Sequence, residues 1–256
     1  YTSGAIPEWQ VFTTSHGLID DYISVITKGT DNTLWLGSQN GVSHYRPGHT
    51  PEWESYTTAS GLVDNRISEI ATAPDGAVWF GTYYGGVSRY HPHETPQWRS
   101  FTMANGLASD YVESVAVGGD GTLWLGTRGS GVSRCVYSVT LTCQTFTTTH
   151  GLASNFVYAI EIEENDAIWF GTSAGLTRYQ ITPLEEWQTY MTLYSVRALS
   201  LDVTNRLWIG TTDGVRWYQN DTFSDWLTYS DGLTDSYIFD IVPTNLNKIW
   251  LATRNG

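Results

Sequence analysis

The chain has 256 residues, and its 26 acidic residues outnumber its 13 lysines and arginines, which gives a formal net charge of −13 at pH 7. Nucleic-acid binding depends on neutralising phosphates with Lys and Arg, so this balance excludes nucleic acid as a partner and disfavours anionic membrane surfaces. The sequence contains no apolar run of about 20 residues, so we expect no membrane insertion by this segment.

One short phrase recurs along the whole chain: an aliphatic residue, a tryptophan, a large apolar residue and a small residue. Its tryptophans are Trp35, Trp79, Trp124, Trp169, Trp208 and Trp250. Successive copies lie 39 to 45 positions apart. Repeats of roughly 40 to 50 residues with several short strands each are typical of a β-propeller. We therefore expect one all-β domain built from this repeat.

The second repeat shows how its strands are expected to follow one another. Asp75-Gly76 lies between two apolar runs and predicts a tight hairpin in which both central residues have positive φ. Gly85-Gly86 separates the second run from the third, and prolines follow the third. The predicted strands cover residues 67–70, 77–82, 87–90 and 98–102. Four antiparallel strands per repeat, with the first innermost, make one propeller blade.

Extending this pattern predicts a single β-propeller of six four-stranded antiparallel blades over residues 1–256. The blades cover approximately residues 23–58, 67–103, 112–147, 157–190, 196–229 and 238–256, and residues 1–14 complete the last one. Completion in this way would close the ring and leave no free sheet edges. The alternative is that the chain is part of a ring with seven or more blades.

A second pattern couples the third and fourth strands, because a Tyr and a Trp lie eight positions apart in most repeats. The pairs are Tyr1 and Trp9, Tyr45 and Trp53, Tyr90 and Trp98, Tyr179 and Trp187, and Tyr218 and Trp226. This constant spacing indicates direct cross-strand neighbours. In the remaining repeat the two positions hold Cys135 and Cys143, the only cysteines, which predicts a disulfide and an oxidising compartment. The alternative is two free thiols in the core.

The repeat as a whole resembles a known family. It joins Gly-Leu, an Asp or Asn turn, an Ile-x-x-Ile strand, Asp-Gly, Leu-Trp-Leu-Gly-Thr and Gly-Val-Ser-Arg-Tyr, best seen in residues 61–90 and 106–134. This combination is similar to the two-component regulator propeller repeat, although the fifth repeat lacks the Gly-Leu turn. Members commonly form extracytoplasmic sensory parts of bacterial hybrid sensor kinases, often associated with carbohydrate signals. The resemblance implies a periplasmic or extracellular sensor, with other domains of a longer chain as partners.

The candidate binding site lies where the crossing into each innermost strand meets the loop between the second and third strands, on one face of the ring. At one crossing position the residues differ in chemistry although their neighbours repeat, and these residues are Tyr22, Arg66, Tyr111, Phe156 and Tyr237. Neighbouring acids and loop residues complete the site: Asp21, Asp64, Asp110, Asp235, Tyr84 and Arg128. Rings beside hydrogen-bonding groups suit a small polar ligand, such as an oligosaccharide.

Each part of this candidate site has a structural alternative. The repeated acids and amides can recur because the turn needs hydrogen bonds from side chain to backbone. The variable residue beside them can be an aromatic that seals the mouth of the channel. The innermost strands also carry Glu69, Glu113, Arg197 and Asp240, for which lining a solvated channel is the expected role.

The sequence shows no nucleophile elbow, phosphate-binding glycine loop or zinc-spaced cluster, so no catalytic residue, metal or cofactor is expected. It therefore predicts a non-enzymatic, ligand-binding propeller. One alternative is a structural or adhesive protein–protein interaction module, which would carry exposed apolar patches on the blade rims. Another is a propeller lyase resembling the streptogramin lyases, which would need histidines and carboxylates converging on the channel mouth.

Overall fold

The computed structural model describes residues 10–181, 185–190, 193–228, 231–244 and 248–255. Within these residues the regular structure is almost entirely antiparallel strand. Five sheets contain four strands each, arranged in chain order, and the last contains two. Short 3-10 helices occur only in the crossings, at η1 (Thr14–His16), η2 (Met103–Asn105) and η3 (Thr148–His150) of the described chain.

The strands have the following bounds. The first two sheets comprise β1 (Ile23–Lys28), β2 (Leu34–Ser38), β3 (Val42–Tyr45), β4 (Trp53–Tyr56), β5 (Ile67–Thr72), β6 (Val78–Thr82), β7 (Val87–Tyr90) and β8 (Trp98–Phe101). The next two comprise β9 (Val112–Val117), β10 (Leu123–Thr127), β11 (Val132–Tyr137), β12 (Leu141–Phe146), β13 (Val157–Ile162), β14 (Ile168–Thr172), β15 (Gly175–Gln180) and β16 (Glu186–Tyr190). The last two comprise β17 (Val196–Leu201), β18 (Leu207–Thr211), β19 (Gly214–Gln219), β20 (Thr222–Phe223), β21 (Ile238–Pro243) and β22 (Ile249–Thr253).

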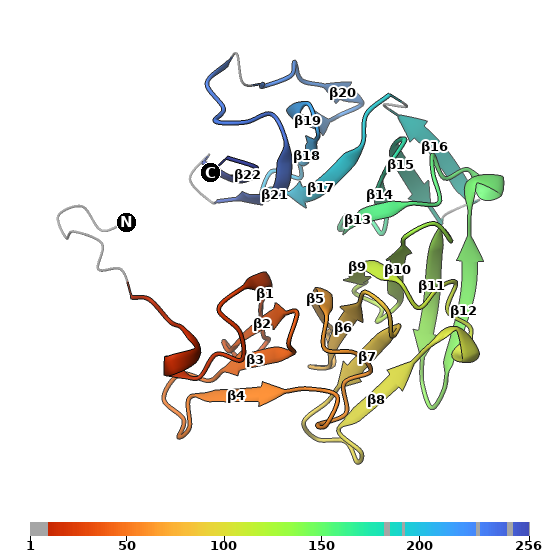
Figure 1. The fold of residues 1–256 in the computed structure, drawn as a ribbon. Coiled ribbons are helices and arrows are strands. Elements are labelled where there is room, and N and C mark those ends of the chain that lie inside the picture. The colour runs from red at the N-terminus through yellow and green to blue at the C-terminus, as the bar shows by residue number, and fades with distance from the viewer. Residues whose placement is uncertain (1–9, 182–184, 191–192, 229–230, 245–247, 256) are drawn as a thin grey trace.

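The sheets follow one another around an arc, with the first strand of each sheet on the inner side (Figure 1). The inner strands of consecutive sheets contact one another, from β1 to β5 and onward through β9, β13 and β17 to β21. The first sheet and the two-stranded sheet lie at the two ends of the arc. This radial arrangement of antiparallel sheets confirms the all-β, propeller-like architecture that the repeat predicts.

The first five sheets pack against one another through aromatic side chains at their outer edges. Phe146, which ends β12, packs against Trp187 of the following sheet with ring centroids 5.2 Å apart. Phe12 makes the same contact with Trp53 of the first sheet, at 5.5 Å. Phe12 therefore occupies the place that an outer-strand aromatic of a preceding blade would take.

The tryptophan of each repeat shows which faces of the sheets are covered. Trp124 is 2% exposed and its counterparts in the other four-stranded sheets are also buried, whereas Trp250 is 68% exposed. At the opposite end of the arc, Ile26 on β1 is 62% exposed and its counterpart Ile70 on β5 only 3%. The arc thus has an uncovered apolar face at each end. Completion of the last sheet by residues 1–14 stays a prediction, because most of that segment lies outside the described residues.

The hairpin between the first and second strands differs from the expected two-residue turn. The amide of Gly76 donates to the carbonyl of Ala73 at 3.0 Å, and the amide of Ala73 donates to the carbonyl of Ala77 at 2.8 Å. Gly76 has a left-handed φ of +85°, but Asp75 does not. The expectation of positive φ at both residues is therefore wrong, since a three-residue loop needs only one left-handed position. Asp75 instead accepts a hydrogen bond from the amide of Ala77 at 2.9 Å.

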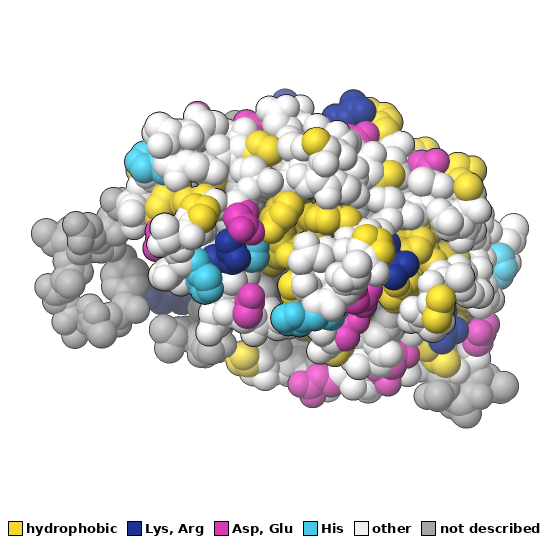
Figure 2. All heavy atoms as spheres, turned by 90° about the horizontal axis from the view of Figure 1, so that it is seen from below, with side chains coloured by type: hydrophobic (Ala, Val, Ile, Leu, Met, Phe, Trp, Pro, Cys, Tyr) yellow, Lys and Arg dark blue, Asp and Glu magenta, His cyan; other side chains and the backbone are white. Residues whose placement is uncertain are grey.

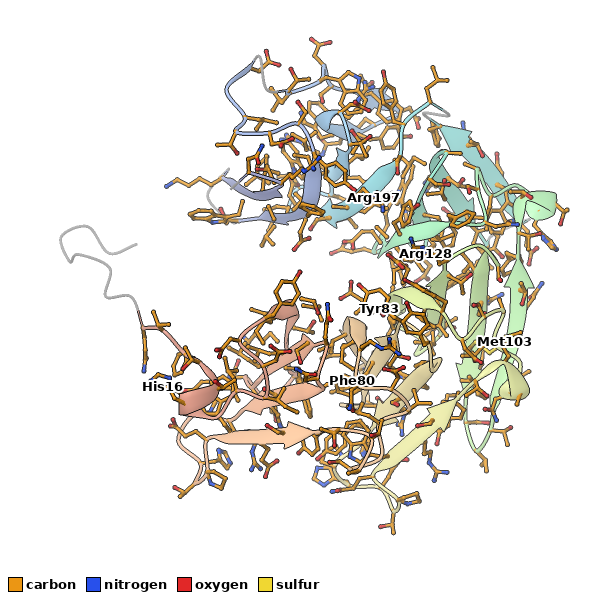
Figure 3. All side chains as sticks on the ribbon, viewed as in Figure 1. His16, Phe80, Tyr83, Met103, Arg128 and Arg197 are labelled. Atoms are coloured by element: carbon orange, nitrogen blue, oxygen red, sulfur yellow. A yellow bond between two sulfur atoms is a disulfide. The ribbon has the colours of Figure 1, made fainter. Side chains whose placement is uncertain are left out.

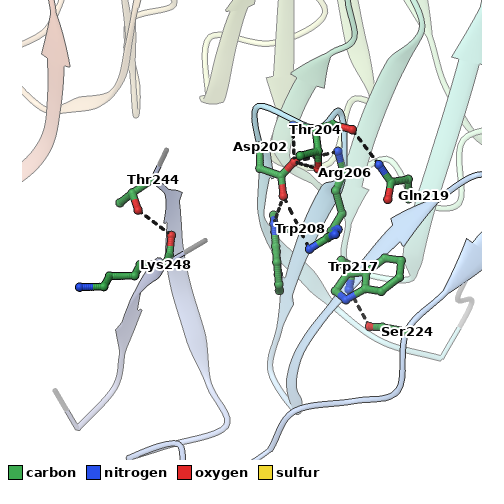
Figure 4. Close-up of polar contacts among 9 residues, drawn as sticks. All are labelled: Asp202, Thr204, Arg206, Trp208, Trp217, Gln219, Ser224, Thr244 and Lys248. Carbon is green, nitrogen blue, oxygen red and sulfur yellow. Dashed lines mark hydrogen bonds and ion pairs between the residues drawn. The ribbon is translucent and has the colours of Figure 1, made fainter. Parts of the chain in front are cut away.

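The fifth sheet shows what an acid at this turn does (Figure 4). Asp202 accepts hydrogen bonds from the amide of Thr204 at 2.8 Å and from the indole Nε1 of Trp208 at 3.0 Å. The side-chain amide of Gln219 donates to the carbonyl of Thr204 at 2.7 Å. The acid thus joins the turn to the buried indole of the repeat, which fixes the second strand against the first.

The register between third and fourth strands confirms the expected aromatic pairs in three sheets, where Tyr45 lies opposite Trp53, Tyr90 opposite Trp98, and Tyr179 opposite Trp187. Cys135 lies opposite Cys143 in the same register, and the two form a disulfide. The expected disulfide is confirmed in place of two free thiols. The first pair, Tyr1 and Trp9, lies outside the described residues.

The expected pair in the fifth sheet is wrong. Tyr218 lies opposite Phe223, because a short turn with left-handed residues at Asn220 and Asp221 closes this hairpin early. Trp226 instead packs against Tyr194, with ring centroids 4.8 Å apart. The spacing of eight was preserved in the sequence, but the shorter hairpin moved a different aromatic into the cross-strand position.

Replacing Cys135 and Cys143 together with serine is expected to lower the free energy of unfolding by about 2–3 kcal/mol, because the disulfide restricts the unfolded chain. Chemical denaturation should show this loss, while Val139→Ser, at an exposed position in the same hairpin, should change the midpoint little. Thiol titration of the unsubstituted protein, denatured without a reducing agent, should detect no free thiol. Two titratable thiols would contradict the assignment.

Candidate functional site

The loops that follow the second strands lie beside the crossings that lead into the first strands. The amide of Tyr83 donates to the carbonyl of Arg66 at 3.1 Å, and the amide of Arg128 donates to the carbonyl of Tyr111 at 3.3 Å. The fourth and last sheets repeat this bond, from Ser173 to Phe156 and from Arg254 to Tyr237. The two kinds of loop therefore share one face of the arc, as the sequence predicts.

The four candidate acids on this face all accept hydrogen bonds from backbone amides. Asp64 accepts from Arg66 at 2.8 Å, Asp235 from Tyr237 at 2.8 Å, Asp21 from Thr14 at 2.6 Å and Asp110 from Met103 at 2.6 Å. Asp64 and Asp235 each accept from the amide two residues later, whereas Asp21 and Asp110 each accept from the amide seven residues earlier. The structural interpretation of the repeated acids is confirmed, which leaves ligand contact by them a prediction.

An aromatic–arginine belt, made of Arg66, Tyr84, Tyr111, Arg128 and Phe156, runs across the second, third and fourth sheets. The guanidinium of Arg66 lies 4.1 Å from the ring centroid of Tyr84, whose ring lies 5.3 Å from that of Tyr111. Arg128 donates from Nη1 to the hydroxyl of Tyr111 at 2.6 Å, and its backbone forms an isolated bridge with Phe156. Cation–π contacts of this kind fix the rings in place.

A hollow of ≈ 370 Å³ opens at the Arg66 end of the belt. Its lining residues are Gln39, Thr58, Val63, Asp64, Asn65 and Arg66. A volume of this size falls within the range of small-molecule sites. Amide, hydroxyl, carboxylate and guanidinium groups surround it, which provides both donors and acceptors for the hydroxyls of a polar ligand.

Two of the predicted crossing residues lie outside the belt. Tyr22 is exposed on the first sheet's crossing. Tyr237 lies at the other end of the arc, where its ring packs against Phe239 at 4.7 Å and lies 6.0 Å from the guanidinium of Arg197. The structure thus brings three of the five crossing residues into one continuous surface and places the other two at its flanks.

A second set of variable residues lies on the inner strands, and the sequence did not predict that these residues form a group. In every inner strand the pairing register shifts at the second residue, which is the mark of a β-bulge. The bulged residues are Ser24, Ser68, Glu113, Tyr158, Arg197 and Phe239. Their signal in the sequence was chemical variation directly after a position that always holds Ile or Val, a signal of the same kind as the one that marked the crossing residues.

The bulged and belt residues meet on the inner side of the arc, where Figure 3 shows Tyr83, Arg128 and Arg197. Burial raises the pKa of the Glu113 carboxyl, whereas the positive charges of Arg128 and Arg197 lower it. Burial also raises the pKa of Tyr83 to about 12, with Glu113 adding to the rise. The inner side of the arc therefore brings the guanidinium groups of Arg128 and Arg197, the carboxyl of Glu113 and the phenol of Tyr83 within electrostatic range of one another.

Two further kinds of site are absent from the part of the chain that the structure describes. Those residues contain no group of three or more His, Cys, Asp and Glu side chains placed to hold a metal ion. They also contain no helix that is long and apolar enough to cross a membrane.

Comparison with known proteins places this architecture. Residues 61–84 match the family model described as a two component regulator propeller, which confirms the resemblance for that repeat. No curated protein sequence matches the chain. The match covers the Gly-Leu turn, the Asp64 turn, the inner strand β5 and the second strand β6 of one blade.

Solved structures share the fold at low sequence identity. The extracellular domain of a hybrid two component system from B. thetaiotaomicron aligns with a TM-score of 0.68 and 20% identity, over 91% of this chain and 37% of that one. PorZ, a surface component of the type-IX secretion system of Porphyromonas gingivalis, aligns with a TM-score of 0.71 and 15% identity, over 92% and 38%. Virginiamycin B lyase from Staphylococcus aureus aligns with a TM-score of 0.71 and 16% identity, over 90% and 76%.

These similarities establish a propeller-type fold only. Binding or catalytic activity has to be inferred from the residues of the site. The chain spans 37% of the length of the two-component extracellular domain that it matches. The same fold therefore occurs in the extracellular domain of a two component system, a secretion component and a lyase, so the assignment of function depends on the belt, the hollow and the bulged residues.

Proposed function

We propose that the chain is a non-enzymatic, extracytoplasmic sensory propeller that binds a small polar ligand, a saccharide in particular, on the face that carries the aromatic–arginine belt. The observation that carries the proposal is the belt itself, whose rings and guanidinium groups come from three sheets and border a hollow of ≈ 370 Å³. Sugar C–H faces stack on aromatic rings, while sugar hydroxyls need the donors and acceptors beside them.

Residence in the periplasm or outside the cell is part of this proposal. The disulfide between Cys135 and Cys143 supports it, because such bonds persist in oxidising compartments. The family match at residues 61–84 and the structural likeness to a two-component extracellular domain support it further. In this setting the natural partners would be the ligand and other domains of a longer sensor chain.

A closed ring completes the proposal. Phe12 packs on Trp53 in the manner of an outer-strand residue of a preceding blade, and both Ile26 and Trp250 present apolar surface at the ends of the arc. Closing six blades through residues 1–14 would cover both ends, as would a ring of seven or more blades. Either closure leaves the belt on one face, because the belt lies within the second to fourth sheets.

Two other functions are less well supported. An interaction module would use apolar patches on the blade rims, but the outer edge seen in Figure 2 mixes apolar with acidic, basic and histidine side chains. A lyase would need a histidine at the channel mouth. His44, the most buried histidine, instead stacks on Trp35 with ring centroids 3.7 Å apart, and burial lowers its pKa to about 4.

Replacing Tyr111 with alanine is expected to weaken saccharide binding by about 2 kcal/mol or more, roughly thirtyfold, because its ring joins both halves of the belt. Tyr237→Ala should weaken binding to a ligand that spans the channel mouth. Tyr111→Phe separates stacking from the hydrogen bond to Arg128 and should lose less. The measurement is a glycan array followed by calorimetry.

The matched control for these variants is Met103→Ala, because Met103 is exposed on the outer side of the arc, away from the belt (Figure 3). All variants should melt within a few degrees of the parent protein, since the substituted side chains are partly exposed. Binding that survives both tyrosine substitutions, or that maps to the opposite face, would refute the proposed function.

A further inference from the structure

The bulge in each inner strand takes one residue of each sheet out of the pairing ladder near the start of the strand. A bulge leaves one residue out of the ladder and re-aims its side chain, and bulges are frequent beside functional sites. On the third, fourth and fifth sheets the bulged residues are Glu113, Tyr158 and Arg197. Three neighbouring sheets thus contribute an acid, a phenol and a guanidinium at equivalent positions.

Arg197 is held over an aromatic ring, with its guanidinium carbon 3.8 Å from the ring centroid of Tyr158. Its buried Nε has no hydrogen-bond partner. Among the described residues, neither Arg197 nor Arg128 forms an ion pair with a carboxylate. Arg128 donates only one hydrogen bond from its guanidinium, to the hydroxyl of Tyr111. Most of the donors on these two side chains are therefore unused.

Glu113 is close enough to both guanidinium groups for their charges to act on it, since each lowers the pKa of its carboxyl. Its Oε2 is nevertheless buried without a hydrogen-bond partner. The other acids named on this face are engaged by backbone amides of the turns. The charged groups at this point that no backbone amide and no ion pair engages are therefore Arg128, Arg197 and Glu113.

We propose that Arg128 and Arg197, flanked by Tyr111 and Tyr158, form a subsite for the carboxylate of an acidic saccharide, such as an oligosaccharide that contains uronic acid. This inference rests on the proposed function and names its ligand class. A guanidinium presents a planar fork of donors that matches the two oxygens of a carboxylate, and a flanking ring can stack on the sugar that carries it. Glu113 in its ionised form opposes the binding of a carboxylate, because the two negative charges repel.

The test is calorimetry with pairs of ligands that differ only in charge. Each pair consists of an oligosaccharide of a uronic acid, such as trigalacturonic acid, and its methyl ester, which keeps the stereochemistry of the sugar. The native protein should bind the acid at least about tenfold more tightly than the ester, because a charge-assisted hydrogen bond to a carboxylate is stronger than one to a neutral ester. This preference should weaken as the salt concentration rises.

The variants separate the subsite from general binding. Arg197→Gln and Arg128→Gln should each remove most of the preference for the acid and change binding of the ester little. Glu113→Gln should strengthen binding of the acid severalfold, because it removes the opposing charge. Arg99→Gln, on the outer strand β8, is the matched control and should leave the preference unchanged.

The outcomes distinguish this inference from the proposed function beneath it. If the ester binds as tightly as the acid, or if the arginine variants keep the preference, the carboxylate subsite is refuted while saccharide binding stands. If neither member of any pair binds but another small molecule does, the proposed ligand class fails together with the subsite. Unchanged circular dichroism and melting temperature of each variant exclude misfolding as the reason for a loss.

Discussion

Replacing Trp124 with alanine is expected to lower the free energy of unfolding by about 3–5 kcal/mol, because the side chain is 2% exposed and its removal leaves a large cavity. Its ring packs against Phe170 and Tyr179 of the next sheet, at 5.7 and 5.6 Å, so the substitution also loosens the contact between two sheets. Chemical denaturation with the midpoint and slope both measured is the appropriate experiment.

The matched variant is Trp250→Ala, at the same position of the repeat in the last sheet. In the open arc Trp250 is 68% exposed, and its loss then costs no more than about 0.5 kcal/mol, whereas in the closed ring that we propose it is covered and its loss costs about as much as that of Trp124. If the two variants are equally destabilised, the end of the arc is covered in solution by a further blade or by the N-terminal segment. A negligible loss at Trp124 would contradict the packing between sheets described above.

Much of the fold was predictable because a repeat tests each expectation several times. The strands of the second sheet lie within two residues of their predicted ends, since Gly76, Gly86 and Pro92 mark the boundaries between them. The prediction failed where one copy departs from the others. In the fifth sheet the turn at Asn220 and Asp221 shortens the hairpin, and Phe223 displaces Trp226 from the position opposite Tyr218.

The candidate site was only partly predictable, for a physical reason. The shared face followed from blade topology, so the neighbourhood of Tyr111, Tyr84 and Arg128 could be expected. The bulge that re-aims Arg197 and Glu113 is a feature of the backbone register, which alternation of apolar and polar residues does not reveal. Chemical variation at one position was visible in the sequence, but the contacts that variation creates between sheets were not.

Two buried carboxyls lead to the remaining prediction. Burial raises the pKa of Glu69 to about 7, against a hydrogen bond that its carboxylate accepts from the amide of Ile70 at 3.0 Å. Burial likewise raises the pKa of Glu161 to about 7, against a bond from the amide of Leu201 at 3.1 Å. In the unfolded chain these groups ionise near pH 4.5. Between these values the native state binds more protons than the unfolded state, so these carboxyls make stability fall as the pH rises from about 4.5 to 7.

Replacing Glu69 with glutamine is therefore expected to raise the free energy of unfolding on the order of 2–3 kcal/mol at pH 8 and by less than about 1 kcal/mol at pH 5. Glu161→Gln should behave in the same way, and glutamine can still accept the backbone hydrogen bond in each case. His44, whose pKa is lowered to about 4, acts in the opposite sense, since its contribution is lost as the pH falls below 6.5. For this reason the stability of each variant is compared with that of the native protein separately at each pH.

Denaturation of the native protein and of these variants at pH 5 and pH 8 provides the measurement, with Glu186→Gln as the control because Glu186 is exposed on β16. The control should change stability equally at both pH values and by no more than about 0.5 kcal/mol. An equal effect of Glu69→Gln at pH 5 and pH 8 would show that its carboxyl titrates normally in the folded protein. The inner wall of the arc would then be hydrated at this position, because burial is the largest cause of the raised pKa of Glu69 and the negative charge of Asp240 only adds to it.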